Sequence, residues 1–529
     1  MKKVSLNVLF VVVVILIFIS CGNPLNDASD PDGTGDSAIT VLPPSFSISP
    51  GTYRKPIALE LTAETAGSVI HYTTNGSEPT SSSPAYSAPI SLNQEGIKTV
   101  KAVAVKEGTA STVTAGTYTL QFIKIRDIDD SSADYRERFE NPVIYNDVLY
   151  FEGTRDSDGL ERPFSVSGSV IAEVSAVLPQ YEQQFVDPIV YNETICFGGH
   201  VNPTTDSGFF TFNGTSYTQI TGLTGDYNYW MYHGIVYNNN LYFLGYDDSG
   251  VQRIFEFDGT SVNEVNAGSS GYNDFFYEAV VYSGNLCFNG QNASGVNYLY
   301  IFDGSSISTP TNTSDYAKGF STPLEYEGKL YFSGQTAIGT SKMYCLNGTG
   351  VEAVSTGSSD YKKGFSGPII YNDVMFFSGT DTSDNPAVFF CDGSVIHDVD
   401  TGSLLLVDLN SAVIYQEECI SYGVNASFEF SLHTLDENGI SEKTMDLPEY
   451  EEGFYYPLIY DGYLIFGGSD SASENHLYIY DGTTLNLIES ASSDIDLSAV
   501  GPSGIIEHSG KVYFKAVDSS GKNRIFGLW

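Results

Sequence analysis

A repeated unit constrains most strictly what this chain can fold into. Between residues 121 and 529, an aromatic or large apolar residue recurs every 44 to 46 residues, and a second one follows it four positions later. The first anchors are Tyr135, Tyr181, Tyr227, Tyr272, Tyr316, Tyr361, Leu405, Tyr450 and Ile495; the second anchors are Phe139, Phe185, Met231, Phe276, Phe320, Phe365, Leu409, Phe454 and Ala499. A fixed period of this length indicates that one supersecondary unit is repeated.

Each unit has room for four short strands. In the unit that starts at Pro368, the expected strands cover residues 369–371, 374–378, 387–390 and 395–399. Such a unit cannot bury its apolar face alone, and stacking against the next unit is typical of propeller blades. We therefore predict an all-β chain with a closed β-propeller over residues 121–529. It would have nine four-stranded blades, with eight as the alternative.

The two ends of the array are complementary. The ninth unit supplies three strands, at 505–506, 512–514 and 524–526. Residues 122–126, just before the first anchor, form an apolar segment that could supply the fourth strand. Pairing of these segments would remove a free sheet edge. We therefore expect terminal strand closure.

An Asn-Gly or Asp-Gly pair recurs between the third and fourth strands, at residues 213, 258, 303, 347, 392 and 481. Such pairs between strands are typical of type I′ hairpin turns, in which both central residues have positive φ. Together with residues 241–243 and 254–260, these turns resemble the ELWxxDGT and kelch-like class of bacterial propeller repeats. The resemblance covers residues from about 120 to 529 and implies the fold alone.

A shorter segment, residues 41–120, shows alternating strands at 57–61, 69–73 and 100–105. About 80 residues with several such strands suit a small sandwich. Residues 51–53, 72–80 and 98–104 resemble the chitobiase/β-hexosaminidase C-terminal domain. That resemblance implies an immunoglobulin-like accessory domain that is not itself catalytic.

The N-terminal residues have the pattern of an export signal. Lys2 and Lys3 precede an apolar run from Val8 to Ile19, and Cys21 follows directly. The run has the length of a signal-peptide core, and the segment resembles a bacterial lipoprotein signal over residues 1–20 with Cys21 as the lipidated residue. An uncleaved membrane anchor is the alternative. Residues 21–40 are polar and acidic, so we expect a flexible tether.

Charge and cysteine usage narrow the function further. The chain has 24 Lys and Arg against 65 Asp and Glu, a net charge of −41, which excludes nucleic-acid binding because phosphates would be repelled. The cysteines beyond Cys21 are an odd number on separate repeats, so they are expected to be small core residues rather than a disulfide framework. These cysteines are Cys196, Cys287, Cys345, Cys391 and Cys419.

No motif for catalysis, for metal binding or for a cofactor stands out. The seven histidines are scattered, and we find no metalloprotease, nucleophile-elbow or phosphate-loop pattern. The sequence therefore predicts no catalytic residue, no metal site and no cofactor. Acidic loops at 156–159, 247–250, 381–384 and 518–521 offer too few oxygens each for calcium, and we interpret them as hairpin turns.

One rim of the predicted propeller is the expected ligand face. Loops between second and third strands share a rim with the crossovers between blades, and binding residues tend to lie on variable loops of a rigid scaffold. Aromatic residues beyond the two anchors gather there, and exposed aromatic faces suit sugar rings or protein ligands. The candidate ligand-binding residues are Tyr229, Trp230, Tyr232, Phe275, Tyr277, Tyr455 and Tyr456.

These observations favour a cell-envelope lipoprotein, held at the membrane by its lipid, whose propeller is a non-catalytic binding or scaffold module for glycan or protein ligands. Gly22 after the lipidated cysteine favours the outer membrane or the cell surface. Two alternatives remain open. One is an extracellular carbohydrate-active enzyme, since a carboxylate pair could be hidden among the many acids, and the other is an envelope-assembly scaffold.

Overall fold

The computed structural model describes residues 39–131, 133–174, 181–201, 206–220, 229–247, 249–265, 271–311, 315–400, 402, 404–425, 430–443, 450–490, 492, 495–496 and 503–529. The predicted signal peptide, Cys21 and most of the tether lie outside these residues. The described part contains strands and turns and no helix, so the all-β prediction is confirmed. Accordingly, no helix in that part could span a membrane.

The chain divides into two compact units. The first comprises the described residues up to Pro50, with Leu59–Ile90 and Lys98–Thr117. The second comprises Gly51–Ala58, Ser91–Ile97 and Tyr118–Trp529.

The N-terminal strands are short and form small sheets. Strand β1 pairs with β4, β3 pairs with β6, and a further sheet has the order β2-β9-β7-β5 with β8 on β7. Their bounds are β1 Ser45–Phe46, β2 Gly51–Tyr53, β3 Ile57–Leu59, β4 Leu61–Thr62, β5 Val69–Thr73, β6 Ile90–Leu92, β7 Gly96–Lys106, β8 Thr109–Ala110 and β9 Thr114–Leu120. Alternate residues along β3 and β6 are buried, as in a two-layer sandwich.

Eight sheets follow in which four consecutive strands pair antiparallel in chain order. The first four are β11 Tyr135–Tyr145, β12 Val148–Arg155, β13 Glu161–Ser167, β14 Val170–Glu173; β15 Tyr181–Tyr191, β16 Thr194–Val201, β17 Asp206–Phe212, β18 Tyr217–Gln219; β19 Tyr229–Tyr237, β20 Asn240–Tyr246, β21 Gln252–Phe257, β22 Val262–Glu264; and β23 Tyr272–Tyr282, β24 Asn285–Asn292, β25 Asn297–Phe302, β26 Ile307–Ser308. Each is one sequence repeat.

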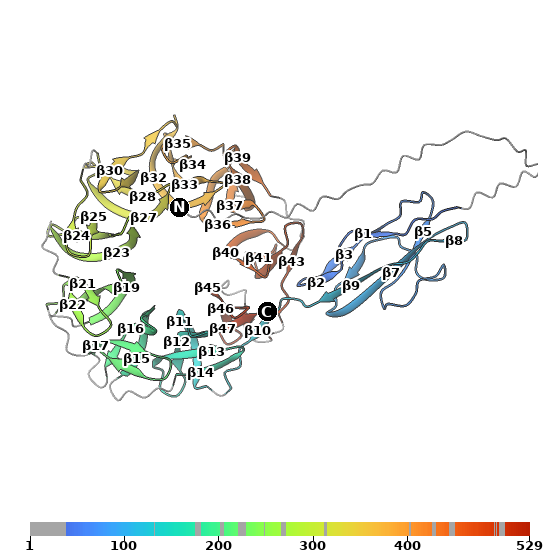
Figure 1. Ribbon diagram of the computed structural model, residues 1–529, viewed down its shortest axis with the longest axis horizontal. Coiled ribbons are helices and arrows are strands. Elements are labelled where there is room, and N and C mark those ends of the chain that lie inside the picture. Colours follow the sequence, from blue (N-terminus) through green and yellow to red (C-terminus); the bar gives the residue numbers. More distant parts are fainter. Residues whose placement is uncertain are drawn as a thin grey trace, which may run out of the picture. The chain divides into compact units, whose positions relative to one another are not determined.

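The next four sheets are β27 Lys318–Tyr326, β28 Lys329–Gln335, β29 Ser341–Asn347, β30 Gly350–Ala353; β32 Tyr361–Tyr371, β33 Val374–Asp381, β34 Pro386–Cys391, β35 Val395–Asp398; β36 Leu404–Tyr415, β37 Glu418–Asn425, β38 Phe430–Asp436, β39 Gly439–Glu442; and β40 Glu452–Tyr460, β41 Tyr463–Ser469, β42 Asn475–Tyr480, β43 Leu485–Leu487. The short strand β31, Ser355–Thr356, adds to β35 in parallel. Figure 1 shows the sheets following one another in chain order.

The ninth repeat combines strands from distant parts of the sequence. It contains β44 Ile495–Asp496, β45 Ser503–His508, β46 Lys511–Asp518 and β47 Asn523–Leu528. Strand β10, Ile125–Asp127, pairs antiparallel with β47, with Ile125 opposite Leu528. The segment expected to act as a donated strand therefore lies beside the C-terminal strand.

Apolar clusters lie between consecutive sheets. One cluster contains Leu299 of the fourth sheet and Phe320 of the fifth, and another joins Phe389 of the sixth to Tyr326 of the fifth. The first sheet packs in the same way on the ninth, through Phe139 and Tyr513. The cysteines predicted to be core residues are buried within such clusters and carry free thiols, at positions 196, 287, 345, 391 and 419.

The first strand of each sheet contacts the first strand of the next one. These contacts run from β11 through β15, β19, β23, β27, β32, β36 and β40 to β45, and β45 also contacts β11. In the first eight repeats the first strand begins near the first anchor rather than after the second, so it is longer than the sequence predicted. Strand β32, for example, starts at Tyr361 and not near residue 369.

The turn between first and second strands is the most regular feature of the repeats. In the third, both turn residues have positive φ, 47° at Asn238 and 65° at Asn239, as a type I′ turn requires. The same holds at residues 146–147, 192–193, 283–284, 327–328, 372–373, 416–417, 461–462 and 509–510.

A tyrosine hydroxyl links eight of these nine turns to the preceding sheet. The tyrosine that ends a first strand donates to the carbonyl of the second turn residue in the next repeat, as Tyr282 does to Gly328 at 2.8 Å. The tyrosines are Tyr145, Tyr191, Tyr237, Tyr282, Tyr326, Tyr371, Tyr415 and Tyr460. In the ninth repeat the position holds His508, whose Nε2 lies 3.1 Å from the carbonyl oxygen of Asp147 in the first repeat.

The prediction of type I′ turns at the Asx-Gly pairs was wrong. Only the glycine has positive φ there, for example 96° at Gly259, and Asp258 does not. The Asp258 carboxylate instead accepts the N–H groups of Thr260 and Ser261 at 2.7 and 2.8 Å. The Asx residue therefore acts through its side chain, which takes the place of a backbone acceptor.

Loss of the inter-sheet hydroxyl should weaken the fold measurably. We expect Tyr282→Phe and His508→Ala each to lower the free energy of unfolding by about 1 kcal/mol, the usual net value of one hydrogen bond. Urea unfolding followed by tyrosine fluorescence measures this change. Tyr456→Phe, at a side chain that is 53% exposed, serves as the control and should change nothing.

The Asx-Gly turns should contribute to acid unfolding. Hydrogen bonds from the N–H groups of Ser261 and Ser306 lower the pKa values of Asp258 and Asp303 to about 2. Because these folded-state values lie below the unfolded value of about 4, the turns stabilise the fold above pH 4 and lose that effect as the pH falls towards 2.

The double variant Asp258→Asn/Asp303→Asn tests this, because Asn213 occupies the same turn position naturally and accepts the same hydrogen bonds. The variant should show a shallower loss of stability between pH 4 and pH 2 in thermal melts. An unchanged slope would contradict the prediction.

Candidate functional site

The first strands carry an irregularity that recurs from repeat to repeat. Their register against the second strand shifts between the first anchor and the end of the strand, as between Tyr272 and Val280. In the first, second, fourth, fifth, sixth and eighth repeats, the residues three and six positions after the first anchor have positive φ. Such bulges re-aim side chains, and they are common at binding sites.

Buried tyrosines hold the first bulge in place. The hydroxyl of the first anchor donates to the carbonyl three residues later, as Tyr316 does to Gly319 at 2.8 Å and Tyr361 to Gly364 at 2.9 Å. The Tyr316 and Tyr361 hydroxyls also accept an N–H from the preceding sheet, that of Leu299 and that of Met343. Burial raises the pKa of Tyr361 to about 12. The phenol therefore stays protonated and remains a donor at physiological pH.

The residue at the first bulge differs between repeats. Gly319, Gly364 and Gly453 occupy it in the fifth, sixth and eighth repeats. At Gly453 an added Cβ would lie 2.6 Å from the Tyr455 ring, so glycine allows a close approach there.

Earlier repeats have residues with a side chain at the same position. Arg138, Gln184 and Phe275 adopt φ values of 79°, 73° and 66°. Left-handed backbone at such residues costs of order 1 kcal/mol or more, and it concentrates at functional sites. The side chains of the first, second and fourth repeats are therefore the strongest candidates for a function.

Three of the predicted ligand-binding residues come together on neighbouring first strands. Tyr232 on β19 and Phe275 and Tyr277 on β23 lie around His233. The ring centroids of His233 and Tyr277 are 4.6 Å apart, those of Phe275 and Tyr277 are 5.5 Å apart, and those of Tyr232 and His233 are 6.4 Å apart. We call these four residues the aromatic cluster.

Backbone geometry positions this cluster. His233 and Phe275 both have positive φ, and the His233 N–H donates to the Asp187 carboxylate at 3.3 Å. Burial raises the pKa of Tyr232, whose ring packs against the core between the third and fourth sheets. Tyr232, Phe275 and Tyr277 are partly exposed, and His233 is exposed. They can therefore offer aromatic faces to a ligand.

The remaining predicted residues lie elsewhere or outside the described side chains. Tyr455 and Tyr456 are on β40 in the eighth repeat, 41% and 53% exposed, and form a separate pair. Tyr229 and Trp230 begin β19, and their side chains lie outside the described part. The sequence thus located one cluster and one exposed pair.

Sequence reasoning missed His233 and Arg138. Each occupies a repeat position at which sister repeats have glycine, Gly367 for His233 and Gly364 for Arg138. The sequence did contain a signal for both residues: a large side chain at a repeat position where other repeats have glycine.

The oxygen-rich loops are hydrogen-bonded turns. Asp247 accepts the N–H groups of Ser249 and Val251, and its second oxygen lies 3.3 Å from Arg253 Nε. Asp470 starts the equivalent loop, and His476 replaces the arginine at 3.0 Å. With Glu474, these two residues form a group that could hold a metal ion, but the hydrogen-bonded pair matches the one made by Asp247. We therefore assign it to the loop.

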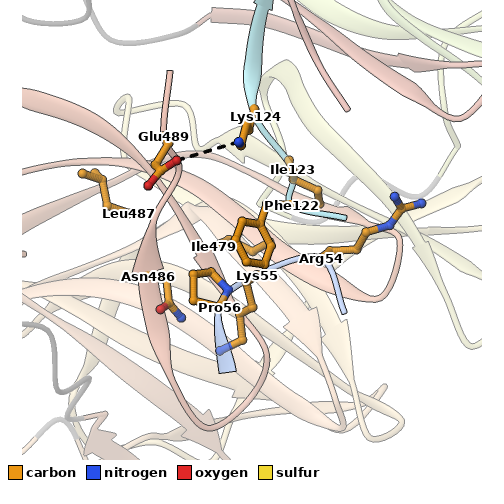
Figure 2. A pocket seen from close by; sticks show the side chains of 10 residues that line it. All are labelled: Arg54, Lys55, Pro56, Phe122, Ile123, Lys124, Ile479, Asn486, Leu487 and Glu489. Atoms are coloured by element: carbon orange, nitrogen blue, oxygen red, sulfur yellow. Dashed lines mark ion pairs between the residues drawn. The ribbon is translucent and has the colours of Figure 1, made fainter. Parts of the chain in front are cut away.

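A hollow of ≈ 210 Å³ lies elsewhere in the second unit (Figure 2). Apolar side chains, including Phe122, Ile123 and Ile479, form part of its wall. Lys124 also lines it and pairs with Glu489 at 3.9 Å, the pair drawn in Figure 2.

The positively charged side chains that line this hollow are paired with carboxylates. Lys55 is 3% exposed, and its Nζ lies 2.8 Å from Asp481. Burial lowers the pKa of Lys55, and the ion pair opposes that shift. Arg54 pairs with Asp461 at 2.5 Å. These cations therefore hold the polypeptide together and leave little charge to attract an anion.

One family of known domains matches part of the chain. Residues 48–121 match the chitobiase/beta-hexosaminidase C-terminal domain. The match supports the predicted immunoglobulin-like domain. No curated protein matches the chain.

Among solved structures, a puromycin-hydrolyzing peptidase of Mycobacterium tuberculosis aligns at 12% identity with a TM-score of 0.32, over 65% of this chain and 60% of that protein. A crystal structure of puromycin hydrolase aligns at 8% identity with a TM-score of 0.32 over 65% of this chain. A crystal structure of a puromycin hydrolase mutant complexed with PGG aligns at 9% identity with a TM-score of 0.32 over 64% of this chain. The chain spans 60% of the length of each.

Proposed function

We propose that this protein is an exported, lipid-anchored component of the bacterial cell envelope whose nine sheets close into a kelch-like β-propeller. The propeller serves as a non-catalytic binding or scaffold module for glycan or protein ligands. The observation that carries the closed ring is the contact between His508 and the turn of the first repeat, which repeats the link made by eight tyrosines.

Two further observations support closure. The first strands contact one another in a cycle that returns from β45 to β11. Strand β10 completes the ninth sheet beside β47. The second arrangement covers an edge of β47 that would otherwise be free to pair with other chains.

The binding role rests on the aromatic cluster. Its rings are held by a strained backbone and by packing, so little conformational entropy is lost when a ligand stacks on them. Aromatic faces of this kind suit the apolar faces of sugar rings and apolar side chains of proteins. The immunoglobulin-like domain would act as an accessory module.

Binding should depend on the aromatic cluster. We expect Tyr232→Ala/Tyr277→Ala to reduce binding to glycan or envelope-protein arrays at least tenfold, because two stacking surfaces are lost. Biolayer interferometry with the best array ligand measures the change. The matched control is Tyr455→Ala/Tyr456→Ala, which also removes two exposed aromatic rings. It distinguishes the contribution of the Tyr455–Tyr456 pair from that of the aromatic cluster. Unchanged binding in the cluster variant would remove this role.

Lipid attachment should depend on Cys21. In cells labelled with an alkyne fatty acid, the full-length protein should carry label and fractionate with membranes, and Cys21→Ser should abolish both. Cys196→Ser, at a buried core thiol, is the control and should keep both. Label on the Cys21→Ser protein would contradict lipid attachment at Cys21. Protease treatment of intact cells would show whether the protein faces the cell exterior.

A further inference from the structure

Arginine is concentrated in one part of this acidic chain. Of its eight arginines, six lie in the first repeat or in the strands of the ninth sheet: Arg126, Arg136, Arg138, Arg155, Arg162 and Arg524. Two of them, Arg136 and Arg138, line a cavity of ≈ 370 Å³ together with Glu137, Glu140, Glu161 and Asn523. We call it the charged cavity. Its volume falls within the range of small-ligand sites.

The Arg138 guanidinium is held in a fixed orientation. It lies 2.7 Å from Glu152 Oε1 and 3.1 Å from Glu161 Oε1. Glu152 is 1% exposed, and its other oxygen accepts the N–H of Phe185 in the second repeat at 2.6 Å. A buried carboxylate anchored in this way pre-organises the arginine at the cavity wall.

Arg138 has two features that are unfavourable for stability. Its φ of 79° is a conformation that sister repeats give to glycine, as at Gly319 and Gly364. Its Nε is buried and has no hydrogen-bond partner. An unsatisfied buried donor and a strained backbone both cost stability, so their occurrence at one residue in a cavity wall indicates a ligand-binding role.

The charged cavity offers donors and acceptors together. Two guanidinium groups and the Asn523 amide can donate, and three glutamate carboxylates can accept. Lys515 further neutralises Glu140, at 2.8 Å. Arg136 also pairs with Glu137, at 3.0 Å. A phosphate or carboxylate ligand would be repelled by the glutamates, and an apolar ligand would displace water from these charged groups without offering hydrogen bonds in return. A neutral ligand with several adjacent hydroxyl groups satisfies both kinds of partner.

We infer that the charged cavity binds a neutral sugar residue. Ring hydroxyls donate to Glu137 and Glu161 and accept from Arg136 and Arg138. This assignment rests on the proposed binding role and makes it specific, since it places a sugar in the first repeat beside the ninth sheet, apart from the aromatic cluster of the third and fourth repeats.

Saturation-transfer-difference NMR on the full chain tests the assignment, with glucose, galactose and N-acetylglucosamine as neutral probes and glucuronate as the anionic probe. Arg138→Gly introduces the residue that sister repeats carry, and we expect at least a tenfold loss of affinity for the neutral probe that binds best. Arg136→Gln removes a cation that holds no buried carboxylate, and we expect a similar loss without a change in melting temperature.

Lys362→Gln is the matched control, because Lys362 follows the first anchor of the sixth repeat as Arg136 follows that of the first. It should bind as the unaltered protein does. Sugar binding that survives Arg136→Gln, or a preference for glucuronate, overturns the assignment. If the protein binds protein ligands through the aromatic cluster but none of the neutral sugars, the assignment fails while the proposed binding role stands.

Discussion

The hydrogen bond from the last residue of each first strand to the following repeat is the constraint on which the remaining structure depends. It joins two sheets through a rigid, buried side chain, as between Tyr237 and Gly284. The acceptor is a carbonyl in a two-residue turn whose φ values are both positive. Because the turn and the tyrosine recur together, each pair of neighbouring sheets is held in the same relative position. The apolar clusters between sheets can therefore repeat with the same geometry.

The regular two-residue turns lie at the C-terminal ends of the first strands, so the N-terminal parts of these strands are available for variation. The bulges there are fixed by anchor tyrosines, so a side chain can change without moving the strand. Arg138, Phe275 and Gly364 occupy one equivalent position with very different chemistry. The anchor tyrosines recur while the residues at the bulges differ. The same backbone can therefore carry a charged cavity in one repeat and an aromatic cluster in others.

Much of the architecture was predictable from the sequence because it depends on periodic apolar residues. The anchors located every repeat, and the Asx-Gly pairs marked the turns between third and fourth strands. The conformation of those turns was not predictable from the pair alone, since Asp258 accepts hydrogen bonds through its side chain instead of adopting positive φ. The sites depend on bulges and on inter-sheet contacts, such as that of Glu152 with Phe185, which no local pattern encodes. Aromatic content therefore identified Tyr232 and Tyr277, while Arg138 and His233 required the structure.

The pairing of β10 with β47 has a consequence for how the protein is made. Arg126 and Trp529, which are in hydrogen-bond contact, are 403 residues apart in sequence. The ninth sheet therefore cannot form until β47 has been synthesised, and until then β10 has no partner strand. A nascent chain cut short by a few residues would keep its edges open and remain a substrate for proteases.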